Sequence, residues 1–112
     1  MGAGYIVKAM IKTSKEAELI DAVQRYMENA TNVIFKDNHE PDSIENIARI
    51  FLADHQGMFI IGDDGSYSSG FAATYGWNDI LYDWWCAMEP YLDEGSFMKV
   101  WPDEGSWEVR VF

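Results

Sequence analysis

Hydrophobic and polar residues separate most clearly between residues 76 and 95. On a helical wheel at about 100° per residue, the large apolar side chains fall within an arc of about 140°, wide enough for a core-facing stripe. These apolar residues are Trp77, Ile80, Leu81, Trp84, Trp85, Met88, Tyr91 and Leu92. The other positions hold Asn78, Asp79, Tyr82, Asp83, Cys86, Glu89, Asp93 and Glu94, without one cation. The pattern predicts an amphipathic helix that anchors the core with one side and presents an acidic face with the other. Pro90 should bend or end this helix near its last turn.

Two further helices are predicted before it. Thr13 to Glu16 fit a capping box with Thr13 as the N-cap, and the helix that follows runs to about Ala30. Its apolar residues recur at helical spacing: Leu19, Ile20, Val23, Met27 and Ala30. The next helix starts at Asp42, its expected N-cap, and Gly57 stands where a C-terminal glycine stop is expected. The stripe that this helix buries is Ile44, Ile47, Ala48, Phe51 and Leu52.

Strands are predicted where the pattern has a period of two. Residues 5–12 alternate, with Lys8 and Lys12 on one side and Tyr5, Val7, Ala9 and Ile11 on the other. Residues 58–61 and 66–74 form a hairpin around the turn 62–65. Residues 33–35 are too short to classify by period and are a candidate for one further brief strand.

The C-terminal segment predicts a second hairpin with a defined register. If residues 102–105 form its loop, Lys99 lies opposite Glu108 and Val100 opposite Trp107. One face then turns toward the core, and its residues are Met98, Val100, Trp107, Val109 and Val111. Trp101 faces the other way, so we expect it to be exposed and available to an interface. The order β-α-(β)-α-β-β-α-β-β predicts a single α+β domain over residues 1–112, with an antiparallel sheet packed against about three helices.

Size and composition agree with a small globular protein. The chain has 112 residues, of which 48% are hydrophobic, enough for one domain with a core. No apolar run approaches the length of a membrane span, and the first residues lack the basic and apolar regions of a signal peptide. The single cysteine, Cys86, cannot form an internal disulfide. We therefore expect a cytoplasmic protein.

The net charge of −11 is placed unevenly along the chain. Residues 76–112 carry 8 acidic and 2 basic side chains, and no Lys or Arg lies between Arg49 and Lys99, where there are 8 carboxylates. Such a field repels nucleic acid and anionic membranes and attracts basic surfaces. We therefore expect no direct binding to nucleic acid or to a membrane.

Candidate catalytic groups are few. Asp63 and Asp64 lie in a turn between apolar strands, where paired carboxylates can hold Mg²⁺, although Gly and Asp are also ordinary turn residues. Cys86 lies on the acidic face, which disfavours a thiolate, and it shows no usual zinc-ligand spacing with His39 or His55. We expect no catalytic residue, metal or cofactor, and the alternative is a small metal-dependent hydrolase using Asp63, Asp64 and His55.

The acidic helix and the tip of the second hairpin are the preferred candidate site for a partner with a basic groove. The residues assigned to this role are Asp79, Asp83, Glu89, Asp93, Glu94, Trp101, Asp103 and Glu104. In small size and strong acidity, the chain resembles phage and mobile-element inhibitors of restriction and CRISPR systems. This resemblance of composition rests on no motif, and it implies a non-catalytic nucleic-acid mimic that blocks a nuclease or another nucleic-acid-binding protein. An immunity protein for a basic toxin would present the same surface, and an ordinary solvated helix face is the simplest alternative. The sequence leaves the oligomeric state open.

Overall fold

The computed structural model describes residues 2–30, 33–35 and 39–112. It contains three α-helices and five strands, as the predicted α+β fold requires. In chain order the elements are β1 (Gly2–Met10), α1 (Glu16–Asn29), α2 (Ile44–Phe51), the 3₁₀ turn η1 (Asp54–Gln56), β2 (Ile60–Ile61), β3 (Tyr67–Thr74), α3 (Trp77–Met88), the 3₁₀ turn η2 (Glu89–Tyr91), β4 (Phe97–Pro102) and β5 (Trp107–Arg110). The sheet order is β2-β3-β1-β4-β5, and every neighbouring pair is antiparallel.

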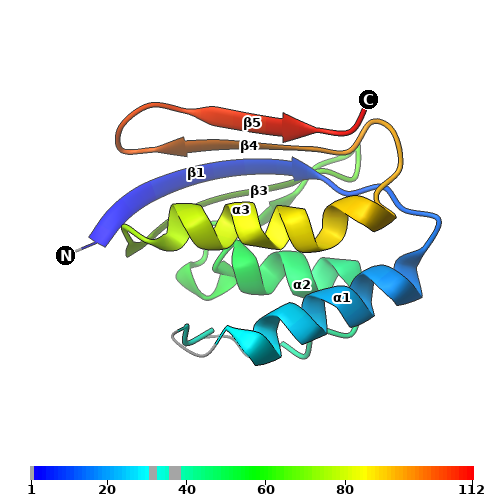
Figure 1. Ribbon diagram of the computed structural model, residues 1–112. Coiled ribbons are helices and arrows are strands. Elements are labelled where there is room, and N and C mark those ends of the chain that lie inside the picture. Colours follow the sequence, from blue (N-terminus) through cyan, green and yellow to red (C-terminus); the bar gives the residue numbers. More distant parts are fainter. Residues whose placement is uncertain (1, 31–32, 36–38) are drawn as a thin grey trace.

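The molecule has two layers, because all three helices lie against one face of the sheet (Figure 1). The central strand β1 shows why: Tyr5 and Val7 are buried toward the helices, whereas Ile6 and Lys8 between them are exposed. No described helix covers the opposite face, which we call the open face (Figure 1). An antiparallel sheet tolerates this arrangement, since one of its faces can remain in water.

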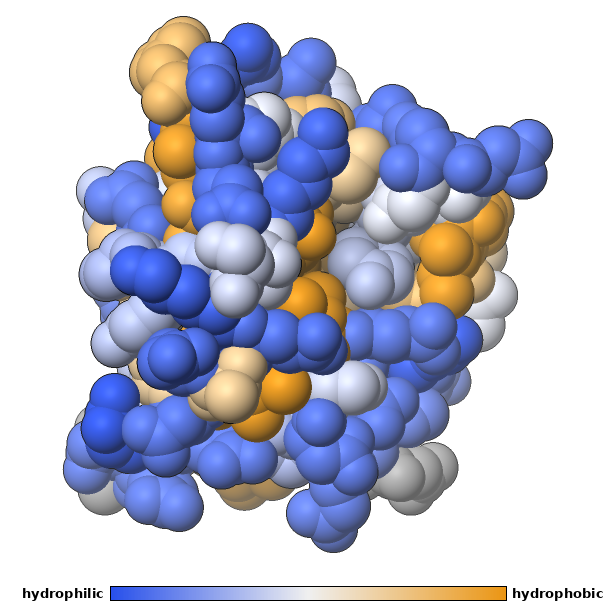
Figure 2. Space-filling model, turned by 90° about the vertical axis from the view of Figure 1, so that its right-hand side faces the viewer, coloured by the Kyte–Doolittle hydropathy of each residue, from blue (hydrophilic) through white to orange (hydrophobic). Residues whose placement is uncertain are grey.

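The end of the molecule at which α3 stops and β4 begins is mostly hydrophilic. A space-filling view onto this end shows separate hydrophobic patches within a largely blue surface (Figure 2). Small apolar patches of this kind are normal on protein surfaces and mark no binding groove by themselves.

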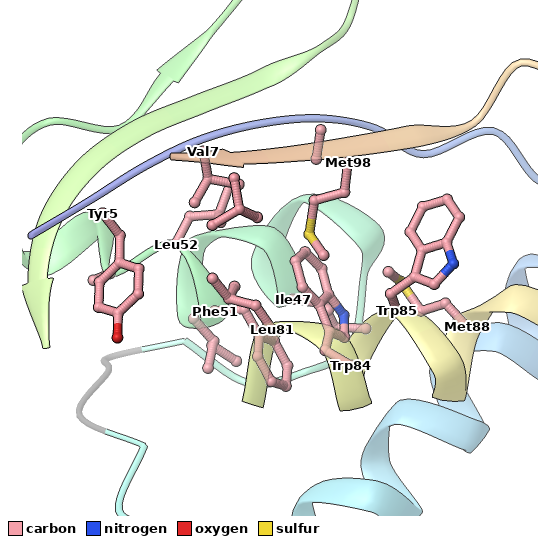
Figure 3. Packing of buried hydrophobic residues seen from close by; sticks show 14 of the residues in the cluster. Tyr5, Val7, Ile47, Phe51, Leu52, Leu81, Trp84, Trp85, Met88 and Met98 are labelled. Atoms are coloured by element: carbon pink, nitrogen blue, oxygen red, sulfur yellow. The ribbon is translucent and has the colours of Figure 1, made fainter. Parts of the chain in front are cut away.

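The core is built around α3, as its apolar stripe predicts. Trp84 stacks on Phe51 of α2 with ring centroids 4.7 Å apart and an interplanar angle of 1° (Figure 3). Leu81, Trp85 and Met88 of α3 are also buried within the same cluster. The helix ends at Met88 and continues as the 3₁₀ turn η2, which contains Pro90 at the predicted position. A stack of wide aromatic side chains thus joins α2 to α3.

The register of the second hairpin is confirmed. Lys99 pairs with Glu108 and Val100 with Trp107 across β4 and β5. Met98 and Val100 are buried, while Trp107, Val109 and Val111 are half-buried against the core. Trp101 is 43% exposed on the open face, as predicted.

The predicted start of the first helix is wrong. The helix α1 begins at Glu16 with Lys15 at the N-cap, and no side chain caps it. Instead, the Thr13 hydroxyl accepts a hydrogen bond from the Lys15 N–H at 2.9 Å and donates to the Tyr91 carbonyl at 2.5 Å. A tertiary hydrogen bond to η2 thus engages the hydroxyl that the capping box would have used.

The second helix also differs in detail from its prediction. Ser43, rather than Asp42, is the N-cap of α2, and its hydroxyl accepts the Asn46 N–H at 3.1 Å. Asp42 binds the side chain of the same Asn46 at 2.8 Å. The helix ends at Phe51, and Gly57 with φ of 82° ends the separate turn η1. Residues 33–35 form no strand, and they contribute Phe35 to the core instead.

The outer edge of β3 is closed partly by a side chain. The two-residue strand β2 pairs only with Tyr67 and Ser68. Farther along β3, the Gln56 amide donates to the Ala72 carbonyl at 2.7 Å and accepts the Ala72 N–H at 2.9 Å. Gln56 thereby makes the two hydrogen bonds that a neighbouring strand would make at this position.

Replacing a buried residue of α3 should weaken the whole domain. We expect Leu81→Ala to lower the free energy of unfolding by about 2–5 kcal/mol, because Leu81 is fully buried and the substitution leaves a cavity. The exposed residue Asp83 on the same helix is the control, and Asp83→Ala should change stability by no more than about 0.5 kcal/mol. Urea denaturation followed by tryptophan fluorescence measures both, and equal effects would contradict the role of α3 as core anchor.

Candidate functional site

The candidate site is a line of exposed carboxylates, which we call the acidic surface. It comprises Asp79, Asp83 and Glu89 from α3 and η2, Asp93 and Glu94 from the following loop, and Asp103 and Glu104 from the β4–β5 turn; all seven are exposed. The core stripe of α3 determines this placement, because burying Trp84 and Trp85 turns the acidic positions outward. Each carboxylate on α3 therefore rests on a rigid element.

The fold brings the hairpin tip to the start of α3. Burial raises the pKa of Tyr5, and the charges of Asp103 and Asp79 raise this pKa further. Both carboxylates therefore lie within electrostatic reach of the Tyr5 hydroxyl, although they are distant in sequence. Figure 1 shows the same arrangement, with the β4–β5 turn and the first turn of α3 at one end of the molecule.

A cation, Lys12, lies near the other end of the acidic surface. A β-carbon placed on Gly95 would come within 3.2 Å of the Lys12 Nζ, so this ammonium group lies against the loop that carries Asp93 and Glu94. The Asp93 backbone N–H also donates to the Lys12 carbonyl at 2.7 Å. The helical pattern of residues 76–95 could not indicate this cation, because Lys12 follows β1 and is distant in sequence.

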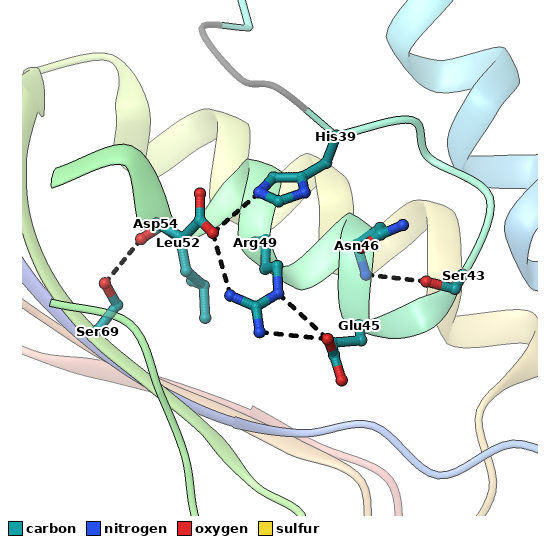
Figure 4. Close-up of polar contacts among 8 residues, drawn as sticks. All are labelled: His39, Ser43, Glu45, Asn46, Arg49, Leu52, Asp54 and Ser69. Atoms are coloured by element: carbon teal, nitrogen blue, oxygen red, sulfur yellow. Dashed lines mark hydrogen bonds and ion pairs between the residues drawn. The ribbon is translucent and has the colours of Figure 1, made fainter. Parts of the chain in front are cut away.

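Ion pairs are concentrated away from the acidic surface. Arg49 of α2 binds Glu45 at 3.2 Å and Asp54 at 3.1 Å, and His39 binds the same Asp54 carboxylate at 2.9 Å (Figure 4). Further pairs are Arg25–Asp21 on α1, and Lys99–Glu108 and Arg110–Glu108 on the last two strands. On the face around α2, the carboxylates of Glu45 and Asp54 thus have side-chain partners.

Five carboxylates of the acidic surface remain unpaired. Among residues 2–30, 33–35 and 39–112, no hydrogen bond or ion pair engages the side chains of Asp79, Asp83, Glu94, Asp103 and Glu104. The other two have structural partners. Glu89 accepts the Trp85 indole N–H at 3.0 Å, and Asp93 accepts the Ser14 hydroxyl at 3.3 Å.

Trp101 is separated from the acidic surface. It pairs across the sheet with the exposed Ile6, so its side chain is on the open face, whereas α3 lies on the other side of the sheet. The carboxylates assigned from sequence are exposed on α3, on the loop after it and at the hairpin tip, whereas this tryptophan lies on the other side of the sheet.

Tyr82 is an exposed aromatic residue beside the acidic surface. It lies on the acidic side of α3, is 50% exposed, and packs edge-to-face on Trp107 with ring centroids 6.1 Å apart. The Trp107 indole N–H donates to Asn78 at 3.0 Å, which ties α3 to β5. A hydrogen bond with Cys86 raises the pKa of Tyr82, and the carboxylates of Glu89 and Asp83 act in the same direction. On the helical wheel, Tyr82 lies among the acidic residues. Because tyrosine is enriched at protein interfaces, its presence on this face was the sequence feature that could have marked it as a candidate.

The alternative catalytic set is not assembled. His55 follows α2 and lies near Ala72 and Thr74 at the end of β3, whereas Asp63 and Asp64 lie in the turn before β3 begins. In the part of the chain that the structure describes, no group of three or more His, Cys, Asp or Glu side chains could hold a metal ion.

Asp64 has a structural partner in its own turn. Its carboxylate accepts the Ser66 hydroxyl at 2.6 Å and the Ser66 backbone N–H at 3.0 Å. These two hydrogen bonds lower the pKa of Asp64, with the hydroxyl as the larger cause. This arrangement stabilises a turn, which is the simpler of the two interpretations of the sequence.

A cavity of about 400 Å³ lies beside β3 and is mostly apolar. Ile50, Phe71 and Trp77 form part of its wall, with His55 at its exposed rim. Gln56, another lining residue, already uses its amide to bind Ala72. Among the described residues that line the cavity, no pair of groups is arranged for acid–base or nucleophilic chemistry.

No family model matches the sequence, and comparison with curated proteins and with solved structures finds no significant match. Within the described ranges, no helix combines the length and the apolar character that a bilayer span requires. The acidic surface must therefore be interpreted from its own geometry.

Removing the Ser66 hydroxyl should raise the pKa of Asp64 toward its ordinary value of 3.8. Because the folded-state pKa is lowered, the ionised carboxylate contributes its full stabilisation above the unfolded-state pKa and loses it as the pH falls through the folded-state pKa. In Ser66→Ala, this acid-side dependence should therefore become smaller. An NMR titration of the Asp64 carboxyl carbon measures the shift. Ser68→Ala is the control, and identical Asp64 titrations in the two variants would contradict the assignment.

Proposed function

We propose that this protein is a non-catalytic binding protein whose acidic surface engages a basic surface of a partner protein. The partner expected from the chemistry is a nuclease or another nucleic-acid-binding protein, and the mode of action is that of a nucleic-acid mimic. The observation that carries the proposal is the set of unpaired carboxylates that begins at Asp79 and Asp83 and includes Asp103 and Glu104. These groups lie on a rigid helix and at the tip of an adjoining hairpin.

The spacing of the carboxylates suits a groove that binds phosphates. Asp79 and Asp83 are one helical turn apart, a rise of about 6 Å, so both can meet the same row of cations. Proteins bind the nucleic-acid backbone chiefly through Lys and Arg side chains that neutralise phosphates, and carboxylates can take the place of those phosphates. Like charges at this spacing also cost the isolated helix a few tenths of a kcal/mol. A partner cation would remove that cost.

Tyr82 adds the apolar part of the proposed interface. It is half-exposed on α3, next to Asp79 around the helix and on the side away from Asp83, and its contact with Trp107 limits its motion. A fixed aromatic ring surrounded by charged residues is a common arrangement at the centre of a protein interface. An immunity protein bound to a basic toxin would use the same surface, and identification of the partner separates that form from an inhibitor of a nucleic-acid-binding enzyme.

Neutralising two of the carboxylates should abolish partner binding while the fold survives. In Asp79→Asn/Asp83→Asn we expect affinity to fall by at least about tenfold, or about 1.4 kcal/mol, since both charges are unpaired and face the partner. The native protein, immobilised and exposed to a host lysate, should retain a basic protein that high salt or excess duplex DNA displaces. The partner is then purified, and calorimetry measures its affinity for each variant.

A charge-matched variant provides the control. Glu16→Gln/Glu18→Gln removes the same amount of charge from exposed positions in the first turn of α1. It should bind as tightly as the native protein. An equal loss of affinity in both double variants would show that only the net charge of the protein matters for binding. Unchanged affinity in Asp79→Asn/Asp83→Asn would refute the proposal.

A further inference from the structure

The strand β5 forms a free edge of the sheet. The Val111 N–H donates to the Ser96 carbonyl at 2.9 Å, and the Val111 carbonyl accepts the Gly95 N–H at 3.1 Å, so the backbone of Val111 faces the β4 side. Backbone groups in an antiparallel strand point alternately to its two sides. The N–H and C=O groups of Glu108 and Arg110 therefore point away from β4, where the sheet order has no further strand among the described residues.

The side chains along this edge are complementary to themselves. Glu108 and Arg110 stand on either side of Val109. In an antiparallel pair of β5 strands related by a two-fold axis at Val109, Glu108 of each copy lies opposite Arg110 of the other. The same register brings the outward backbone groups of these two residues together as a hydrogen-bonded pair. We propose that a second copy of this chain pairs along β5 in this register, which joins two five-stranded sheets into one.

The charge pattern favours a second copy over simple protection of the edge. Edge strands are commonly protected by charges that repel a copy of the same strand. Within one chain, Glu108 already contacts Arg110 and Lys99. A parallel or shifted arrangement would set like charges of the two copies opposite one another, whereas the two-fold antiparallel register sets Glu108 opposite Arg110 twice and can extend these pairs between the copies. For each combination of charges at positions 108 and 110, this register therefore predicts whether the dimer becomes weaker or is restored.

Apolar groups beside the edge are also left incompletely covered. Val109 and Val111 are only half-buried on the helix side of β5, and Phe112 at the end of the chain is 91% exposed. In the proposed register, Val109 meets Val109 of the second copy, and Phe112 lies opposite Ser106. Such an interface is isologous and closes after two chains. The proposal uses the sheet edge and does not depend on the acidic surface.

Charge reversal and its compensation test the pairing. As its concentration is raised to the level used for NMR, the native chain should form a dimer. Sedimentation equilibrium measures this association at about 0.15 M salt, where charges are screened beyond about 8 Å. Arg110→Glu should weaken the dimer on the order of tenfold, because two-fold symmetry sets two pairs of like charges opposite each other. The double variant Glu108→Arg/Arg110→Glu restores opposite charges and should restore the dimer.

The control is Lys8→Glu, which changes the net charge by the same amount at an exposed position on the central strand β1 and should leave the dimer intact. In a mixture of isotope-labelled and unlabelled chains, the register further predicts an NMR contact between the Val109 α-protons of the two copies. The proposal is refuted if the native chain stays monomeric, if Arg110→Glu dimerises like the native chain, or if the double variant fails to recover. Loss of the dimer in Lys8→Glu would likewise refute the specific register.

Discussion

The stack of Phe51 on Trp84 is the contact on which the rest of the structure depends. It joins α2 to α3 beneath the sheet, at a separation of 4.7 Å and with almost parallel rings. Phe35 and Tyr26 also pack against Phe51, so α1 and the segment before α2 converge on the same ring. Because large aromatic side chains must lie inside, the opposite side of α3 is turned to solvent. The core therefore determines which way the carboxylates of α3 face.

The open face carries cationic side chains beside Glu108, whereas α3 itself carries none. Lys8 and Lys99 are cross-strand partners on the open face, and Arg110 follows on β5. Arg49, by contrast, is already bound by Glu45 and Asp54 within the helix layer. The carboxylates of α3 thus lie on the opposite side of the sheet from the lysines of the open face. A uniform distribution of the same net charge would not produce a directional field of this kind.

Local patterns predicted the elements and much of their pairing. The Lys99–Glu108 register followed from a four-residue loop and a period of two, both of which are local properties of the chain. The start of α1 did not, because Thr13 binds the carbonyl of Tyr91, which is 78 positions away in sequence. The candidate site likewise depends on contacts between distant parts of the chain. The helical wheel placed Asp79 and Asp83 outward, but only the folded chain brings Asp103 near Asp79 and places Lys12 against Gly95.

The small contact between Gln56 and Ala72 has a consequence for how far the sheet can extend. A sheet with two open edges can add copies in both directions and become a fibre. On the β3 side, however, the strand β2 is only two residues long and the Gln56 side chain occupies the backbone groups of Ala72. Addition of a strand on this side is therefore hindered, and in the dimer proposed through β5 the short strand β2 and Gln56 lie at both outer limits of the joined sheet. Gln56 thus helps to limit the proposed assembly to two chains rather than a fibre.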